Sequence, residues 1–144
     1  MDYKKSIGLE IRILSNLCRR EMDRSSSIQY VESVTGTNGW IIGYLADNQG
    51  RDIFQRDLEE EFSVRRSTAS KVLKLMEQKG LIRRESVPYD ARLKKLVLTD
   101  TALEMHSHVV RDSERLEAKL TKGLTDEELQ TFFAIAEKIK DNLQ

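Results

Sequence analysis

Apolar residues recur at helical spacing near the middle of the chain. Four of them, between positions 64 and 80, fall at i, i+3, i+4 and i+7, which places them on one face of a helix. They are Ala69, Val72, Leu73 and Met76. The opposite face carries Ser67, Lys71, Lys74 and Gln78. Gly80 follows at the position where helices commonly end with a residue in the left-handed conformation. The pattern therefore predicts an amphipathic helix that ends at this glycine.

Shorter patterns flank this helix on both sides. Before it, residues 54–62 offer Leu58 and Phe62 to a core, and Ser63–Val64 form a break of the length typical of a helix-turn-helix. After it, two short runs of apolar and charged residues on either side of a turn are typical of a β-hairpin. The strands are expected at residues 81–87 and 92–98, with the turn at 88–91. This order of elements predicts a winged helix-turn-helix in a mainly α protein.

The N-terminal segment predicts a long first helix from Ser6 to about Arg24. Its apolar stripe consists of Ile7, Ile11, Leu14 and Cys18, widened by Ile13 and Leu17. The three serines that follow weaken a helix, so residues 25–36 are expected to form a ragged end or loop.

Thr37 is expected to cap a second helix that ends near residues 48–50. Trp40 in this helix is expected in the core, because large aromatic side chains dominate buried area. Two starts compete for the next helix: Asp52 with Gln55 as its reciprocal partner, or Phe54.

Two further helices are predicted at the C-terminal end. The first begins at Thr99 or Asp100 and ends at Gly123, and a capping box at residues 125–128 starts the second. The last helix carries Leu129, Phe132, Phe133, Ala136, Ile139 and Leu143 at helical spacing. These helices and the first lie outside the winged unit, so they are expected to bury one another across the twofold axis of a homodimer.

The chain is neutral overall, but its charge is segregated. Residues 65–95 hold ten basic and three acidic residues, a net charge of +7, whereas residues 1–64 carry −3 and residues 96–144 carry −4. A basic window that coincides with a helix-turn-helix is the electrostatic footprint of a protein that binds double-stranded DNA. The basic window therefore decides which partner the winged unit is expected to face.

The whole chain limits the remaining classes. Its length suits a single domain over residues 1–144, with the winged unit at 37–99 and dimerisation helices at 1–36 and 100–144. A signal peptide and an apolar run of about 18 residues are both absent, which favours a cytoplasmic protein without membrane contact. The lone Cys18 excludes an internal disulfide.

Chemistry beyond binding finds little support in the sequence. There is no phosphate loop and no set of nucleophile, base and orienting residue, so neither an enzyme nor a bound cofactor is expected. His106 and His108 are two positions apart on a predicted helix and point to different sides, so they are not expected to share a metal ion. His106 is expected in a core or an interface.

Several local sequences together resemble the MarR family of bacterial transcription regulators, which are winged helix-turn-helix homodimers. These sequences are RSTASK at 66–71, LMEQKGLI at 75–82, Asp90-Ala91-Arg92, and LVLT at 96–99. The resemblance implies that a palindromic operator is read by two copies, whose half-sites lie about one turn of DNA, roughly 34 Å, apart. It favours a repressor that a small molecule releases.

The resemblance also assigns roles to residues. It places Arg66, Ser67, Thr68, Ser70 and Lys71 at the major groove. Arg92 would enter the minor groove, with Asp90 holding its guanidinium, which suits the negative potential of a narrow groove. Two readings stay open for Lys74, Lys94 and Lys95, which either contact phosphates or are solvated charges.

One departure from the family pattern concerns the start of the recognition helix. Arg65 stands where many relatives carry a serine or aspartate N-cap, and its side chain accepts no hydrogen bond. Ser63 or Ser67 would have to substitute as the cap. Ser63 itself stands where a turn glycine is common.

An effector is also implied by the resemblance. Many relatives release DNA when a small phenolic or anionic compound binds between the dimerisation helices and the winged unit, and here Arg19, Tyr30, Trp40 and Tyr44 are the candidate lining. Some relatives sense oxidants through a cysteine in the first helix, and Cys18 lies in that helix beside two arginines, but a cysteine on an apolar stripe is more often a small core residue. The alternative function is a winged-helix module for protein interaction or for DNA binding without sequence specificity.

Overall fold

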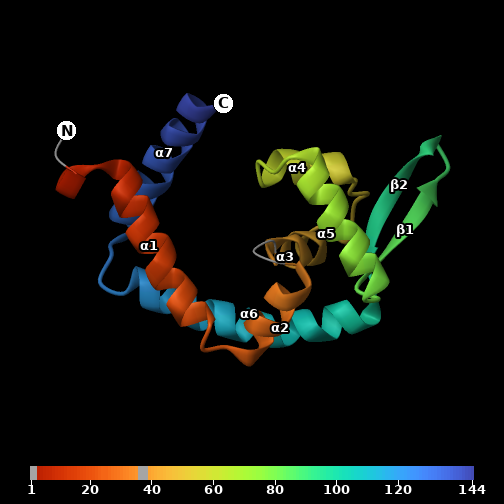
Figure 1. The fold of residues 1–144 in the computed structure, drawn as a ribbon, viewed down its shortest axis with the longest axis horizontal. Coiled ribbons are helices and arrows are strands. Elements are labelled where there is room, and N and C mark those ends of the chain that lie inside the picture. Colours follow the sequence, from red (N-terminus) through yellow and green to blue (C-terminus); the bar gives the residue numbers. More distant parts are fainter. Residues whose placement is uncertain (1–2, 36–38) are drawn as a thin grey trace. The chain divides into compact units, whose positions relative to one another are not determined.

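Helices dominate the computed structural model, which describes residues 3–35 and 39–144 (Figure 1). In chain order the elements are η1 (Tyr3–Lys5), α1 (Ile7–Met22), α2 (Ser26–Thr35), α3 (Trp40–Asp47), α4 (Gln55–Glu61), α5 (Arg66–Gln78), β1 (Ile82–Val87), β2 (Asp90–Leu98), α6 (Asp100–Thr121) and α7 (Asp126–Leu143). The mainly α fold with a hairpin after a helix-turn-helix is confirmed. Contacts group residues 1–112 and 113–144 as two compact units, and one domain over the whole chain stays a prediction.

Where the structure describes the chain, it holds no helix that is both long and apolar enough to cross a membrane.

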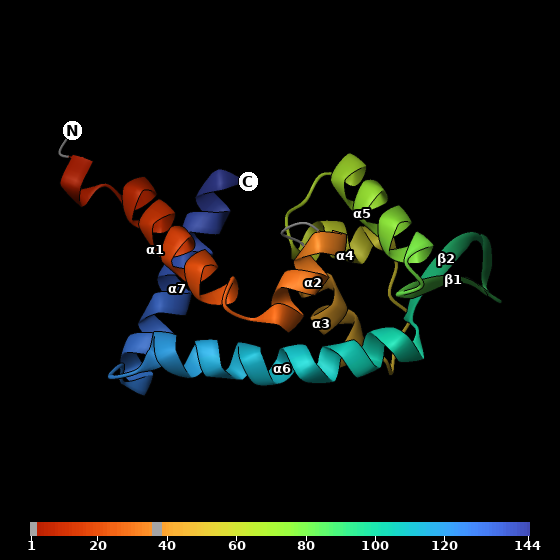
Figure 2. The same ribbon diagram turned by 60° about the horizontal axis from the view of Figure 1, so that its bottom comes forward.

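The core of the first unit forms where the helices of the winged unit meet the base of the hairpin. Figure 1 shows α5 between α4 and the strands, and in Figure 2 α2 and α3 lie over the first part of α6. Leu58, Leu73 and Met76 are completely buried, and Ala102 brings α6 into the same cluster. The apolar face predicted for α5 is thus confirmed as core.

The expected loop at residues 25–36 is wrong, because α2 occupies most of it. The side chain of Ser25 accepts a hydrogen bond from the backbone N–H of Ile28 at 3.0 Å and so starts the helix. Ile28 and Val31 are buried, which supplies the packing that a serine-rich start lacks. The serines therefore begin a second helix as well as ending the first.

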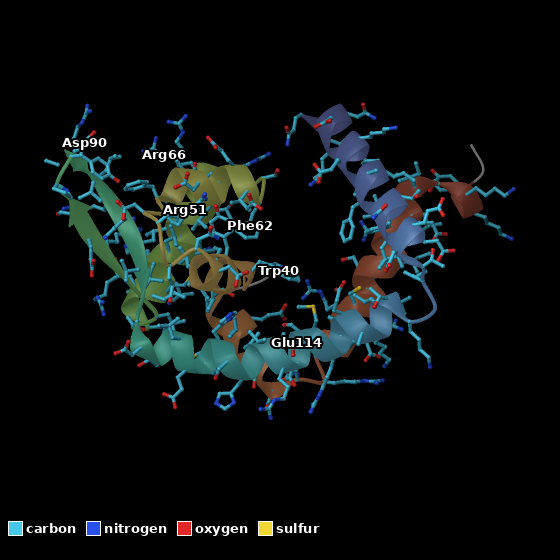
Figure 3. The ribbon with its side chains drawn as sticks, turned by 180° about the vertical axis from the view of Figure 1, so that it is seen from behind. Trp40, Arg51, Phe62, Arg66, Asp90 and Glu114 are labelled. Atoms are coloured by element: carbon cyan, nitrogen blue, oxygen red, sulfur yellow. The ribbon has the colours of Figure 1, made fainter. Side chains whose placement is uncertain are left out.

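The start of α3 also differs from expectation. Trp40 is 63% exposed instead of lying in the core, and the burial falls to Ile41, Ile42 and Leu45. Trp40 is the first residue of the helix, and its side chain points out from that end (Figure 3). The predicted cap, Thr37, lies outside the described residues, whereas the end of the helix next to Asn48 is confirmed.

Of the two starts weighed for α4, the one at Phe54 is confirmed. Asp57 accepts a hydrogen bond from the backbone N–H of Phe54 at 2.8 Å, which fixes the first turn. Asp52, the other candidate, does not cap the helix, because both of its carboxylate oxygens bind side chains of the hairpin.

The helix ends predicted toward the C-terminus are confirmed. Thr99 accepts from the backbone N–H of Ala102 at 3.2 Å ahead of α6, and Gly123 has a φ of 80° after it. Thr125 and Glu128 form the capping box of α7. Neither α1 nor α7, both described in full, contains a buried residue.

Candidate nucleic-acid interface

Helix α5 has one face committed to packing and one left to solvent. Ala69, Leu73 and Met76 are buried. On the other side every residue assigned to the major groove is exposed, namely Arg66, Ser67, Thr68, Ser70 and Lys71, and Lys74 is exposed with them. The buried face fixes the helix against the core, so the exposed face is presented by a rigid element.

The start of α5 has no side-chain cap. Its N-cap is Arg65, in extended conformation with φ −70° and ψ 149°, and neither of the two candidates, Ser63 and Ser67, caps it. Ser63 instead occupies the turn with a φ of 48°, the left-handed conformation that explains why a glycine suits this position. The first backbone N–H groups of α5 therefore remain free to donate to an anion.

The basic residues at the start and on the exposed face of α5 carry charge that no described carboxylate neutralises. Across residues 3–35 and 39–144, no carboxylate forms an ion pair with Arg65, Arg66, Lys71 or Lys74. Unpaired cations beside free N–H groups attract phosphate oxygens without first breaking an internal contact. The electrostatics of α5 thus favour an external polyanion.

Gln55 connects the two helices of the helix-turn-helix. Its side-chain N–H donates to the Ser70 hydroxyl at 2.9 Å and approaches the carbonyl oxygen of Arg66 at 3.5 Å. The first residue of α4 thereby contacts the exposed side of α5. Ser70 keeps its own hydroxyl proton for another acceptor, because in this bond it only accepts.

The hairpin carries its arginine next to the turn. Asp90 accepts from the backbone N–H of Arg92 at 2.9 Å, and its two carboxylate oxygens lie 3.3 Å from Nε and 3.2 Å from a terminal nitrogen of the Arg92 guanidinium. These hydrogen bonds lower the pKa of Asp90, which keeps its carboxylate charged. Figure 3 shows Asp90 at the tip of the hairpin and Arg66 at the start of α5.

The other cations of the hairpin also have partners within the chain. Arg83 and Arg84 pair with Glu85 and Glu77 at 3.5 and 3.7 Å. Lys94 donates to the Ser86 hydroxyl at 2.6 Å. Exposed contacts of this kind contribute little stability and exchange readily for a phosphate.

Comparison with known proteins identifies this arrangement. The crystal structure of the transcription regulator MarR from Oenococcus oeni PSU-1 shares 31% sequence identity, covers 94% of this chain and 99% of its own, and superposes with a TM-score of 0.80. The chain belongs to the MarR family. A model of the MarR family matches residues 32–93 of this MarR-family protein, most of its winged unit.

Two further relatives agree with this assignment. An uncharacterised helix-turn-helix transcriptional regulator, YybA of Bacillus subtilis strain 168, is 25% identical over 87% of this chain and 83% of its own length. MepR of S. aureus, in a crystal structure with DNA, has a TM-score of 0.84 at 23% identity, with 99% of this chain and 100% of that chain covered. The likeness to MepR supports the fold, and the MarR family comprises transcription regulators rather than enzymes.

The structure does not join the four residues predicted for an effector site of this MarR-family chain. Among the described residues, no hydrogen bond or ion pair links any two of Arg19, Tyr30, Trp40 and Tyr44. Arg19 lies 3.8 Å from the carboxylate of Glu32, and the Tyr44 hydroxyl accepts from Arg51 at 3.0 Å. Tyr44 also packs edge-on against Phe62, whereas Tyr30 and Trp40 are exposed.

The sulfur and imidazole groups of this MarR-family chain occupy ordinary sites. Cys18 is half-buried on α1, and His106 is half-buried with its ring close to Gly43. His108, which follows Ser107 in α6, is exposed. Within the described part of the chain, no three histidine, cysteine or acidic residues gather as metal ligands do.

Sequence reasoning missed three residues that shape the interface of this MarR-family protein. They are Gln55, Asp52 and Tyr89, which connect α4 to α5 and the α3–α4 link to the hairpin. Their partners lie 15 and 37 positions away in sequence, so no local pattern reveals the contacts. The sequence held one weak indication for Tyr89, because core packing does not explain an aromatic residue in an exposed turn.

Proposed function

We propose that this MarR-family transcription regulator is a homodimeric repressor that binds a palindromic operator in double-stranded DNA. The single observation that supports it most is the exposed face of α5, where hydroxyls, free N–H groups and unpaired cations lie together on a helix held by its buried face. Such a helix suits the major groove. Arg66, Ser67, Thr68, Ser70 and Lys71 are the proposed contacts, and Lys74 and Lys94 bind phosphates.

Arg92 enters the minor groove in this proposal. Its guanidinium is exposed, and Asp90 holds it by two hydrogen bonds, with a third from the backbone N–H of Arg92, next to the turn of the hairpin. A preorganised arginine loses little conformational freedom on binding, and a narrow minor groove concentrates negative potential. Asp90 acts by orienting Arg92 and not by contacting a base.

The proposed dimer is formed by the terminal helices. Large apolar side chains on α1 and α7 are exposed in the single chain, including Ile7, Ile11, Leu14, Leu17, Phe132, Phe133 and Ile135. An exposed apolar stripe of this kind on each of two helices is characteristic of an interface. Two copies joined by these helices add the binding free energies of two half-sites.

The proposal also includes a small-molecule effector, of which only the chemical class is named. A small phenolic or anionic compound would release the operator after binding near Arg19, Tyr30, Trp40 and Tyr44. The exposure of Trp40 supports this, because an exposed aromatic ring at a helix end is available to stack on a ligand. Quenching of the fluorescence of Trp40, the one tryptophan of the chain, would report binding directly.

The deciding experiment is selection of bound DNA from a random pool, followed by competition in a gel shift. A palindromic consensus that unrelated DNA cannot displace supports a sequence-specific dimer. Equal affinity for the consensus and for random competitor would instead identify a module that binds DNA without specificity. Failure to bind any duplex at low salt would favour a winged helix that binds proteins.

A further inference from the structure

The segment between α3 and α4 lies against the outer edge of β2. The backbone N–H of Leu96 donates to the carbonyl oxygen of Ile53 at 2.7 Å, and the Ile53 side chain is buried in the core. This bond and this burial fix the segment to the body of the winged unit. Asp52, the preceding residue, is exposed and faces the hairpin from that fixed position.

Asp52 binds two side chains of the hairpin, one with each carboxylate oxygen. Oδ2 accepts from the Tyr89 hydroxyl at 2.9 Å, and Oδ1 accepts from Lys95 Nζ at 3.3 Å. We name these two contacts the Asp52 clamp. Lys95 belongs to the clamp, so its charge is partly neutralised before any DNA arrives.

The Asp52 carboxylate stays charged and the Tyr89 hydroxyl stays protonated, as the hydrogen bond between them requires. The hydrogen bond from Tyr89, followed by the contact with Lys95, lowers the pKa of Asp52. Partial desolvation and the bond to Asp52 raise the pKa of Tyr89. Because the aspartate pKa is lowered, the clamp is complete above the ordinary pKa of this residue and is lost only as the pH falls through the lowered value.

The turn that the clamp reaches is weakly held by the hairpin itself. Regular pairing runs from Ile82 with Leu98 to Ser86 with Lys94, and the next pair joins Val87 to Asp90, which leaves residues 91–93 outside the regular register. Tyr89 is 62% exposed, so packing does not fix its ring. The position of the turn relative to the helices therefore depends on side-chain contacts such as the clamp.

We propose that Asp52 is a positioning residue for operator recognition, which holds Tyr89 so that the adjoining Asp90–Arg92 pair points in one direction. The proposal rests on the proposed entry of Arg92 into the minor groove. Tyr89 directly precedes Asp90 in the turn, so a rotation of the turn carries the guanidinium with it. Holding the turn before DNA binds removes the conformational entropy that Arg92 would otherwise lose on binding.

The sign of a mutational effect separates positioning from simple charge. If Asp52 acted only as a negative charge near a polyanion, removing it would strengthen DNA binding. Tyr89→Phe would then have no effect, since it changes no charge at neutral pH. Positioning requires the opposite result, in which Asp52→Ala and Tyr89→Phe both weaken operator binding.

The experiment measures operator affinity by fluorescence anisotropy over a range of salt, with full-length variants and the DNA selected from a random pool. Tyr89→Phe is expected to weaken binding about 3- to 10-fold, the cost of one hydrogen bond. The slope of affinity against salt should not change, because the charges are the same. Tyr3→Phe is the matched control, since Tyr3 is 71% exposed in η1 and belongs to neither helix-turn-helix nor wing.

A double-variant cycle tests whether the clamp acts through Arg92. In the Arg92→Ala background, Tyr89→Phe is expected to cost nothing further. If Tyr89→Phe alone leaves affinity unchanged while Arg92→Ala weakens it, the positioning role is overturned. An equal loss from Tyr89→Phe with and without Arg92 would overturn it too, because the tyrosine would then be acting independently.

Measurements on the free protein distinguish failure of the clamp from failure of the proposed function. The phenol of Tyr89, followed by carbon-13 NMR, should titrate above the ordinary range of tyrosine and return toward it in Asp52→Ala. Amide exchange at residues 89–92 should accelerate in the same variant. If both changes occur but Arg92→Ala binds the operator normally, the role of Arg92 is wrong and the positioning role falls with it. A normal Tyr89 titration in the native chain would remove the clamp itself.

Discussion

The winged unit and the terminal helices use apolar residues in opposite ways. In the winged unit, Leu58, Leu73 and Met76 are completely buried within one chain, whereas α1 and α7 bury no residue at all. Phe132 and Phe133 remain 58% and 59% exposed although they contact each other edge-on. The winged unit thus buries its apolar residues within a single copy, whereas each terminal helix leaves its apolar residues exposed, as helices of an interface do.

The largest expected effect comes from removing α7. Deletion of residues 124–144 should give monomeric or aggregated protein and lower operator affinity by a factor of about 1,000 or more, because the second half-site is lost. Light scattering with size-exclusion chromatography and a gel shift provide the measurements. Phe133→Ser, a milder change on the same helix, should show the same dimer loss at low concentration. A well-behaved dimer without α7 would contradict the assignment of α7 to the interface.

The next effect concerns the core of the winged unit. Leu73→Ala should lower the free energy of unfolding by about 2–5 kcal/mol, since it leaves a cavity beneath α5. Chemical denaturation monitored by circular dichroism gives the value. The loss should be the same at low and high protein concentration, whereas that of Phe133→Ser should grow on dilution. A concentration-dependent loss for Leu73→Ala would show that the two regions are not independent.

Arg92→Ala should change neither the dimerisation nor the stability of the protein. It is expected to weaken operator binding by about 1–3 kcal/mol and to leave the dimer and the unfolding free energy unchanged, because the side chain is exposed. Anisotropy titration and chromatography measure the two quantities. Lys94→Ala, on the same strand, is the matched control and should cost less. Equal losses from the two variants would indicate that the wing contributes only charge.

The smallest effect is expected at Lys74. Replacing it with alanine should weaken binding to all duplexes alike and reduce the magnitude of the salt slope by about one, as for a phosphate contact. Titrations at several salt concentrations measure the slope. An unchanged slope would identify Lys74 as a solvated charge with no role at the interface.

Local patterns explain how much of the fold the sequence predicted. The spacing of Ala69, Leu73 and Met76, the stop at Gly80 and the capping box at Thr125 act within a few residues, so helix α5, its end and the start of α7 were predicted correctly.

The predictions from the sequence were wrong where a residue distant in the chain determines the local structure. Ser25 starts α2 and also donates to Asp112, 87 positions away, and burial of Ile28 and Val31 needs neighbours that the local sequence does not name. Asp52 was one of two candidate starts for α4, because its true partners on the hairpin are distant in the chain and leave no local signal. Trp40 was assigned to the core from its size alone, but the helix begins at this residue and directs it outward.

The missing cap of α5 has a consequence for the life of the protein between binding events. A helix whose first N–H groups lack a side-chain acceptor frays more easily at that end, and a DNA phosphate placed there would complete the turn. Operator and helix would then stabilise each other by mass action. Protein bound to DNA would therefore resist proteolysis better than unbound protein. Degradation would then remove the unbound protein first.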